Sequence, residues 1–345
     1  MHGSQQLETD RLGPYLAARI PGFGELHSAE KFAGGQSNPT FLLAASGGRY
    51  VLRRKPPGAL LASAHAVDRE YRVMAALRDT GVPVPRVLHL CEDDAVIGSM
   101  FYVMEFLEGR IFWDGTLPDL APAERGAVYD AMNAALASLH RLDPAALGLA
   151  DFGRPGSYFA RQTGRWTKQY RASETQPIPA MDALIAWLER EMPADDGRVS
   201  LVHGDYRIDN MIFAPGGPRI LGILDWELST LGHPFADLAY QCMQWRLPLE
   251  GAFRGLGALD RRAHGLPTED EYVARYCERT GVPGIEGWTF YLAFSFFRLA
   301  AILQGVYKRA LDGNASNPER ARQMGEAVPM LARLAADLIE RECAA

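Results

Sequence analysis

The chain has 345 residues, with 36 Lys and Arg against 42 Asp and Glu, a formal net charge of −6, and 48% hydrophobic residues. This composition is typical of a soluble globular protein, and the length predicts about two domains. The acidic balance argues against a general nucleic-acid-binding protein, which needs a basic face to neutralise phosphates. Four dispersed cysteines without a C-x-x-C pair argue against a disulfide framework or a structural zinc site, and favour reduced thiols in the cytoplasm.

We expect neither a nucleic-acid partner nor a membrane partner. The N-terminus lacks the basic and then apolar run of a signal peptide. The one membrane-like stretch, residues 287–307, carries Arg298 at its middle, where a charge is expensive in a bilayer, so it predicts a buried helix with a functional or paired arginine. The sequence is compatible with a homo-oligomer but does not indicate one.

In chain order, the first hundred residues predict mainly β-structure. The dipeptide Gly47-Gly48 predicts a tight turn between two apolar strands, as in a hairpin. An amphipathic helix is expected over residues 64–80, where Gly81 ends it. Strands are expected over residues 28–33, 40–45, 50–53, 86–90 and 100–106.

Beyond residue 107 the pattern becomes helical, interrupted by short strands and turns over residues 199–226. The expected fold is α+β, with an N-terminal extension or helix over residues 1–24, a β-rich lobe over 25–107 and a helical lobe over 108–345. Helices are expected over residues 121–141, 158–172, 180–191, 269–280, 289–311 and 317–341.

The densest polar cluster in an apolar stretch is residues 201–210, with the sequence LVHGDYRIDN. A hairpin signal follows, and its return strand leads directly into Asp225. Because the turn folds the chain back, we expect Asp205, Asn210 and Asp225 to lie near one another at strand ends. Carboxylate and amide oxygens suit Mg²⁺, and a separate carboxylate can accept a proton from an attacking hydroxyl. The segment therefore predicts a phosphoryl-transfer site.

The pattern His-Gly-Asp-x-x-x-x-Asn followed by Ile-Leu-Asp resembles the catalytic and metal loops of the aminoglycoside phosphotransferase family, which shares the two-lobe protein-kinase fold. The resemblance implies ATP and Mg²⁺ as cofactors, Asp205 as the catalytic base, and Asn210 and Asp225 as the Mg²⁺ ligands. His203 would brace the loop through hydrogen bonds, although a satisfied core histidine is an equal alternative. Asp237 resembles the buried aspartate that holds the backbone of this loop, with a helix N-cap as its alternative.

The N-terminal half is expected to hold the nucleotide through a glycine loop between two strands. The backbone N–H groups of this loop could bind phosphates, but the same residues could equally form an ordinary hairpin turn. The candidate residues are Gly34, Gly35, Ser37 and Asn38.

Arg53 occupies the position of the kinase lysine, a departure from the family pattern, and Lys55 is its rival for the phosphates. Glu70 resembles the glutamate that pairs with this cation, with a solvated helix glutamate as the alternative. Glu105 and Leu107 belong to the predicted linker whose backbone meets the adenine.

Only eleven residues separate Asp225 from Asp237, too few for the activation segment of a protein kinase, so a small-molecule hydroxyl acceptor is expected. The segments YVLRRKPPGALL, DWELSTLG and FRLAAILQG are similar to the phosphotransferase domain fused to some acyl-CoA dehydrogenases, a resemblance that covers residues 25–340. That branch is associated with hydroxy acid or hydroxyacyl-CoA acceptors.

Arg298 and Trp166 are the candidates to bind the acceptor, through its carboxylate or phosphate. A structural ion pair is the alternative for Arg298. Two other hypotheses stay open: an aminoglycoside, homoserine or choline kinase, and a non-catalytic nucleotide-binding pseudokinase. The departure at Arg53 favours the pseudokinase, and the intact catalytic and metal residues argue against it. The choice between ATP and GTP is open.

Overall fold

The computed structural model describes residues 7–32, 38–56, 66–251, 253–313 and 318–343, and the chain divides into two compact units. The segment that carries Asn210 and Asp225 belongs to the first unit, although it lies in the second half of the sequence. The first unit comprises Met1–Ile111, Leu147–Leu149 and Asn210–Ser229, and the second comprises Phe112–Ala146, Ala150–Asp209 and Thr230–Ala345.

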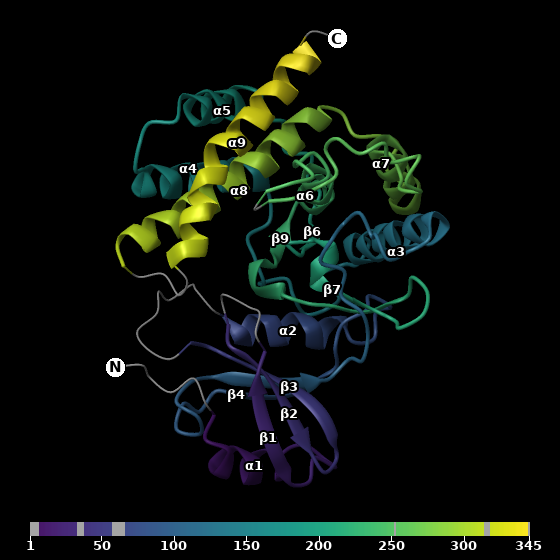
Figure 1. The fold of residues 1–345 in the computed structure, drawn as a ribbon, viewed down its shortest axis with the longest axis vertical. Coiled ribbons are helices and arrows are strands. Elements are labelled where there is room, and N and C mark those ends of the chain that lie inside the picture. Colours follow the sequence, from purple (N-terminus) through teal and green to yellow (C-terminus); the bar gives the residue numbers. More distant parts are fainter. Residues whose placement is uncertain (1–6, 33–37, 57–65, 252, 314–317, 344–345) are drawn as a thin grey trace. The chain divides into compact units, whose positions relative to one another are not determined.

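The first unit is built on an antiparallel sheet in the order β1-β2-β3-β5-β4, which confirms the predicted β-rich lobe (Figure 1). Helix α1 (Thr9–Ala17) buries Leu12 and Leu16 in the same core cluster as Phe41 and Leu43 of the sheet. The strands are β1 (Leu26–Lys31), β2 (Thr40–Ala45), β3 (Gly48–Arg54), β4 (Val87–Cys91) and β5 (Phe101–Glu105).

Helix α2 (Val67–Leu77) presents one buried side to this sheet, and that side includes a carboxylate. Val67, Val73 and Leu77 are fully buried, and Glu70 is buried with them because it shares their face at helical spacing. The helix ends three residues earlier than predicted, and residues 64 and 65 of the prediction lie outside the described residues.

The predicted hairpin at the catalytic segment is present in the first unit. Strand β7 (Met211–Phe213) pairs antiparallel with β8 (Ile220–Ile223). The chain then passes through Asp225 into a short 3₁₀ helix, η2 (Trp226–Leu228).

The second unit is helical, which together with the sheet of the first unit confirms the α+β class. A short ladder of β6 (Ser200–Val202) and β9 (Thr230–Gly232) lies among its helices. Figure 1 shows α8 and α9 packed side by side. The helices are α3 (Pro122–His140), α4 (Tyr158–Ser173), α5 (Pro179–Arg190), α6 (Phe235–Gln244), α7 (Glu269–Thr280), α8 (Trp288–Leu311) and α9 (Pro318–Cys343).

The sequence analysis did not predict helix α6 (Phe235–Gln244), because this helix has no polar face. Every residue from Phe235 to Met243 is buried, so the apolar and polar positions do not alternate with the helical period. By contrast, α7 begins and ends where predicted, since Thr268 and Glu271 form a capping box and Gly281 closes the helix in the left-handed conformation.

Helix α8 is the one described helix that is long and apolar enough to cross a membrane. However, 83% of its most apolar window is buried inside the protein. It is the central helix of the second unit, as the charge at Arg298 predicts.

Candidate active site

The first unit contains a buried cluster of charges centred on Arg53. Its guanidinium lies 2.9 Å from Glu70 Oε2, 2.5 Å from Asp225 Oδ1 and 3.7 Å from Glu227 Oε2. Burial disfavours the charged guanidinium, but Glu70 and Asp225 outweigh it and hold the pKa of Arg53 above its ordinary value. One cation therefore joins three carboxylates that come from α2, the end of β8 and η2.

The alternative cation, Lys55, lies outside this cluster. Its ammonium is 3.7 Å from Asp68, and both side chains are substantially exposed. Of the two candidate cations, Arg53 is therefore the one that pairs with Glu70 and Asp225.

Glu70 is held by three donors rather than solvated. Its side chain is 1% exposed, and besides Arg53 it accepts hydrogen bonds from Asn38 Nδ2 at 2.8 Å and from the Tyr102 hydroxyl at 3.0 Å. The alternative of a solvated helix glutamate is therefore wrong. Asn38 is itself buried and supports the carboxylate, while Gly34, Gly35 and Ser37 lie outside the described residues.

Asp225 adopts a left-handed backbone conformation, with φ 64° and ψ 58°. Such a conformation is uncommon for a residue with a Cβ, although Asp adopts it more readily than most other residues. The hairpin brings the two predicted metal ligands together, because the backbone N–H of Leu224 donates to the carbonyl of Asn210 at 2.8 Å.

The oxygen atoms of Asn210 and Asp225 are of the kind that bind Mg²⁺ in nucleotide enzymes. The Asp225 carboxylate remains one-third exposed and lies beside Glu227, so oxygen ligands face accessible space. Within the described ranges, no three His, Cys, Asp or Glu side chains are arranged to hold a metal by themselves. Mg²⁺ commonly takes only one or two carboxylates from the protein and completes its shell with water and phosphate oxygens.

The predicted adenine linker follows β5 and packs on the β7–β8 hairpin. Glu105 accepts a hydrogen bond from the backbone N–H of Arg86 at 2.7 Å, which fixes the end of the strand. A Cβ at Gly222 would lie 2.5 Å from Leu107 Cδ1, so this close packing depends on glycine in β8.

In the second unit, Asp237 holds the backbone of the predicted catalytic loop. Its carboxylate accepts the N–H groups of His203 at 2.7 Å and Gly204 at 2.8 Å. Asp237 lies in the first turn of α6, and Pro234 is the N-cap, so the N-cap alternative is wrong. Burial acts to raise the pKa of Asp237, but His140, His203 and the N–H of Gly204 outweigh it and lower that pKa.

His203 is fully buried, and its side chain contacts the backbone of its own loop. Its Nδ1 accepts the backbone N–H of Asp205 at 3.2 Å. The loop is therefore fixed from both sides, by an imidazole within it and by a carboxylate from α6.

Asp205 has two further neighbours in the second unit. Arg207 Nε lies 3.9 Å from its Oδ1, and the Asp205 carboxylate lies near enough to the Tyr240 hydroxyl to affect its pKa. Burial, then the charge of Asp205, raises the pKa of Tyr240, so this hydroxyl is protonated. Sequence analysis missed Tyr240, although its position three residues after Asp237 would have placed it on the same face of α6.

A cavity of about 730 Å³ opens beside this loop within the second unit. Its volume is in the range of small-molecule sites. Three arginines and three carboxylates contribute to its wall, so its charge is balanced. Its lining includes Arg207, Asp209 and Tyr240 near the loop, and Trp113, Asp114, Trp245, Leu247, Phe253, Arg254, Leu299, Glu319, Arg320 and Met324 farther out.

Arg298 and Trp166, the two residues predicted to bind the acceptor, lie near each other in the second unit. The guanidinium of Arg298 lies 5.9 Å from the Trp166 ring and 5.6 Å from the Tyr240 ring. No described carboxylate pairs with Arg298, so its predicted structural ion pair is absent from the described residues.

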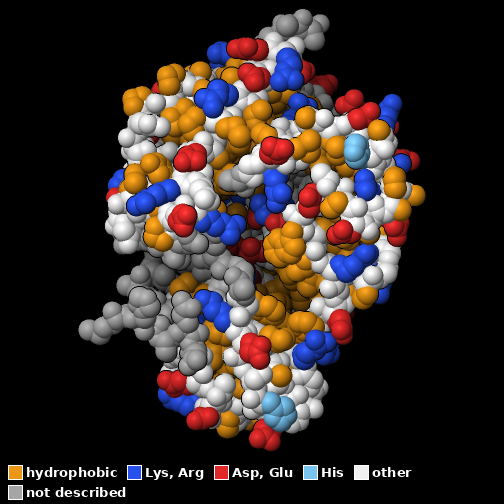
Figure 2. Space-filling model, in the orientation of Figure 1, with side chains coloured by type: hydrophobic (Ala, Val, Ile, Leu, Met, Phe, Trp, Pro, Cys, Tyr) orange, Lys and Arg blue, Asp and Glu red, His pale blue; other side chains and the backbone are white. Residues whose placement is uncertain are grey.

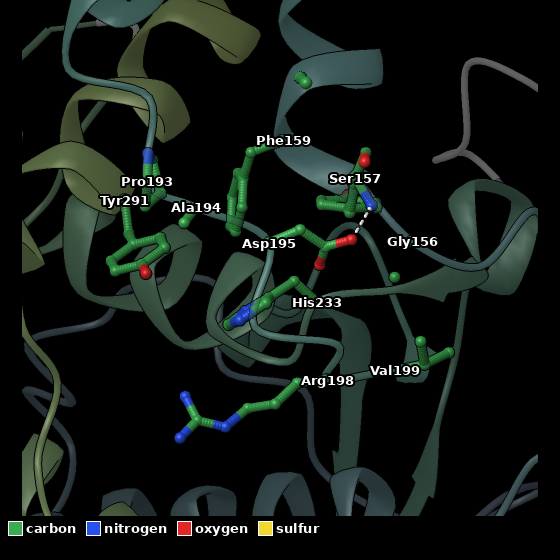
Figure 3. A pocket seen from close by; sticks show the side chains of 13 residues that line it. Gly156, Ser157, Phe159, Pro193, Ala194, Asp195, Arg198, Val199, His233 and Tyr291 are labelled. Carbon is green, nitrogen blue, oxygen red and sulfur yellow. Dashed lines mark hydrogen bonds between the residues drawn. The ribbon is translucent and has the colours of Figure 1, made fainter.

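A smaller cavity of about 80 Å³ lies elsewhere in the second unit (Figure 3). In it, Asp195 accepts the N–H of Ser157 at 2.7 Å, and His233 donates from Nε2 to Asp196 because its Nδ1 accepts the N–H of Phe235. Burial lowers the pKa of His233. The polar groups are satisfied locally and the volume is too small for a substrate.

The sheet unit with its Arg53 cluster and the helical unit with its anchored Asp205 loop define a kinase-like phosphotransferase. The model of the phosphotransferase enzyme family matches residues 28–272, and the chain belongs to this family.

Two curated relatives show high identity over most of this chain. Acyl-CoA dehydrogenase family member 10 of Mus musculus is 51% identical over 313 residues, which are 90% of this chain and 29% of the mouse protein. Probable acyl-CoA dehydrogenase IBR3 of Arabidopsis thaliana is 47% identical over 362 residues, 99% of this chain and 44% of that protein. The chain thus spans less than half the length of these relatives.

Solved structures give the same fold. A "putative aminoglycoside phosphotransferase" from Ralstonia eutropha JMP134 is 49% identical with a TM-score of 0.88, covering 97% of this chain and 99% of that one. Spectinomycin phosphotransferase, crystallised with ADP and spectinomycin, is 12% identical with a TM-score of 0.63, covering 96% of this chain and 98% of that one, a likeness in fold alone.

Proposed function

We propose that the protein transfers the γ-phosphate of ATP, in the presence of Mg²⁺, to a hydroxyl group of a small molecule. The observation that carries the proposal is the Arg53 cluster, in which one buried cation joins Glu70 and Asp225. A sequence motif alone does not require this arrangement. The arrangement of the Arg53 cluster also weighs against a non-catalytic module. Although arginine replaces the usual lysine, Arg53 keeps the positive charge and the ion pair with Glu70.

The two units supply different residues for this reaction. In the first unit, Arg53 binds phosphate oxygens, and Asp225 and Asn210 hold Mg²⁺, which neutralises phosphate charge when bound. In the second unit, Asp205 orients the acceptor hydroxyl and accepts its proton. The hydroxyl oxygen forms a bond to the γ-phosphorus as the bond to the β–γ bridging oxygen breaks, and ADP leaves with that electron pair.

The acceptor class follows from the cavity and from the names of the relatives. Figure 2 shows basic side chains interspersed with acidic ones on the face drawn, and the 730 Å³ cavity is balanced in charge. Such a lining suits a polycationic aminoglycoside poorly. Because the curated relatives are named acyl-CoA dehydrogenases, hydroxy acids and hydroxyacyl-CoA thioesters are the first acceptors to screen, before homoserine.

The variant Asp205→Asn tests the assignment of the base. We expect phosphoryl transfer to fall by about a hundredfold to ten-thousandfold, the usual contribution of a positioned base. Binding of Mg-ATP is expected to be retained, because Asp205 belongs to the second unit. The assay is ADP release with a hydroxyl acceptor panel, with calorimetry for nucleotide binding.

Asp182→Asn is the matched control, since it removes a carboxylate of the same unit that pairs with Arg171 on the surface, outside the loop and the cavity lining. It is expected to keep most of the activity. Transfer by Asp205→Asn at the parental rate would contradict the assignment. Nucleotide binding by the parent without turnover of any acceptor would favour the pseudokinase.

A further inference from the structure

A chain of buried hydrogen bonds in the second unit links helix α7 to the loop of the proposed base. The Tyr276 hydroxyl of α7 lies 2.7 Å from Nδ1 of His140, the last residue of α3. His140 Nε2 lies 3.2 Å from Asp237 Oδ2. The same carboxylate accepts the backbone N–H groups of His203 and Gly204. Three helices that are far apart in the sequence, α7, α3 and α6, are therefore joined to one loop.

The two ring nitrogens of His140 have different roles, because each faces a group of known chemistry. Burial, then the charge of Asp237, raises the pKa of Tyr276, so its hydroxyl keeps its proton. Among the described residues this hydroxyl has one hydrogen-bond partner, His140 Nδ1, so Nδ1 accepts. Nε2 faces the ionised carboxylate of Asp237, which has no proton to donate, so Nε2 carries the hydrogen and donates it. The Tyr276 hydroxyl thus selects the tautomer that Asp237 requires.

The chain is sealed from water. The side chains of His140 and Asp237 are each 1% exposed, and Tyr276 is also 1% exposed. Because water cannot replace a lost partner there, removing one group leaves the next group unsatisfied. Ser200 Oγ donates to the carbonyl of His140 at 2.9 Å, which fixes the backbone that carries the imidazole. These contacts keep the imidazole in one orientation.

Asp237 connects this imidazole to the loop. Its Oδ2 is shared between His140 Nε2 and the N–H of His203, so the direction of the imidazole N–H limits where that oxygen can lie. His203 Nδ1 in turn accepts the backbone N–H of Asp205 at 3.2 Å. Two hydrogen-bonded residues, Asp237 and His203, therefore separate His140 from the proposed base.

We propose that His140 and Tyr276 are positioning residues for phosphoryl transfer. Tyr276 fixes the tautomer of His140, whose Nε2–H holds Asp237 and, through it, the loop that carries Asp205. The inference rests on the proposed function, because it concerns the placement of the base. Both residues act through Asp237 and take no part in the proton transfer.

Substitutions at His140 separate the roles of its two nitrogens. In His140→Gln the side-chain amide reaches the place of Nε2 and can still donate to Asp237, whereas in His140→Asn it ends near the place of Nδ1 and cannot. With a hydroxyl acceptor that is turned over, we expect kcat to fall about tenfold to a hundredfold in His140→Asn and to be largely restored in His140→Gln. The KM for Mg-ATP should stay at the parental value in both, because the Arg53 cluster belongs to the first unit.

Two tyrosines of α7 give a matched pair of variants. Tyr276→Phe removes the hydroxyl that bonds to His140 and is expected to lower kcat about twofold to tenfold, the effect of one hydrogen bond. Tyr272 is similarly buried and lies about one turn earlier, but its hydroxyl has no partner among the described residues. Tyr272→Phe is therefore expected to leave kcat unchanged. Both variants keep the aromatic ring and its packing.

Amide hydrogen exchange, measured by mass spectrometry on the peptide that contains residues 203–205, reports on the loop without any acceptor. Exchange is compared well below the melting temperature of each variant, so that folded forms are compared. We expect faster exchange of this peptide in Tyr276→Phe and His140→Asn, and the parental rate in His140→Gln and Tyr272→Phe. Parental kcat and parental loop exchange in Tyr276→Phe would overturn the inference, as would equal losses in His140→Gln and His140→Asn.

The exchange measurement also separates this inference from the proposed function. Faster loop exchange in Tyr276→Phe and His140→Asn, in a protein whose parent phosphorylates no acceptor, would support the positioning chain and contradict the phosphotransferase proposal. Phosphoryl transfer that is equally fast in the parent and in these two variants would contradict the positioning role and leave the phosphotransferase standing.

Discussion

Two buried arginines, one in each unit, differ in their surroundings. Arg53 lies among the carboxylates of Glu70, Asp225 and Glu227, with distances of 2.9, 2.5 and 3.7 Å. Arg298 lies near the rings of Trp166 and Tyr240, and no carboxylate among the described residues pairs with it.

The difference shows what each unit provides before any ligand binds. The first unit holds its arginine within a set of three carboxylates. The second unit fixes the loop of Asp205 through Asp237, and no described carboxylate pairs with its Arg298. The proposed nucleotide site therefore depends on internal ion pairs, whereas the loop of the second unit depends on hydrogen bonds to one buried carboxylate.

The largest expected effect on stability follows from removing the cation of the first unit. Arg53→Met leaves the fully buried carboxylate of Glu70 without its ion-pair partner beside Asp225, and breaking a buried pair from one side costs about 3–5 kcal/mol. Urea denaturation measures this loss. Arg49→Met is the control, since Arg49 pairs with Glu108 on the surface and such pairs contribute up to about 1 kcal/mol. Equal, small losses in both variants would contradict the internal network of Arg53.

A smaller effect is expected at the anchor of the catalytic loop. In Asp237, Oδ1 accepts the N–H of Gly204, while Oδ2 accepts the N–H of His203 and lies beside His140. Asp237→Asn replaces one of these acceptor oxygens with an NH₂ group, with an expected loss of about 1–3 kcal/mol at neutral pH. The folded pKa of Asp237 lies below its ordinary 3.8, so its contribution is present above about pH 4 and disappears as the pH falls through the folded value.

Denaturation at several pH values measures this contribution. The stability of the parent should fall on acidification below about pH 4, and the difference between parent and Asp237→Asn should shrink there. A difference that is constant down to pH 2 would show that the ionised carboxylate does not support the loop.

The sequence predicted the parts of this molecule that depend on local patterns. The helix α7, with its capping box and C-terminal glycine, was placed at its observed bounds, and the β7–β8 hairpin was expected from its turn. The loop with His203 and Asp205 could be predicted because its polar residues lie close together in the sequence at a characteristic spacing.

Contacts between distant segments were beyond the sequence. The choice between Arg53 and Lys55 depends on which side chain reaches Asp225, 172 residues further along the chain, and only the tertiary packing of the first unit decides it. The contact between Tyr240 and Asp205 likewise requires α6, a helix without a polar face to mark its period. Ion pairs set by tertiary packing leave little trace in local patterns.

The most direct measurement is calorimetric binding of a non-hydrolysable ATP analogue, with and without Mg²⁺, to the parent, to Asp225→Ala and to Asp68→Ala. Asp68 is the control, because it pairs with Lys55 outside the Arg53 cluster. We expect Mg²⁺-dependent binding that is lost, or weakened by about tenfold or more, in Asp225→Ala and retained in Asp68→Ala. Absence of binding, or binding that neither Mg²⁺ nor Asp225→Ala changes, would contradict a nucleotide site built on the Arg53 cluster.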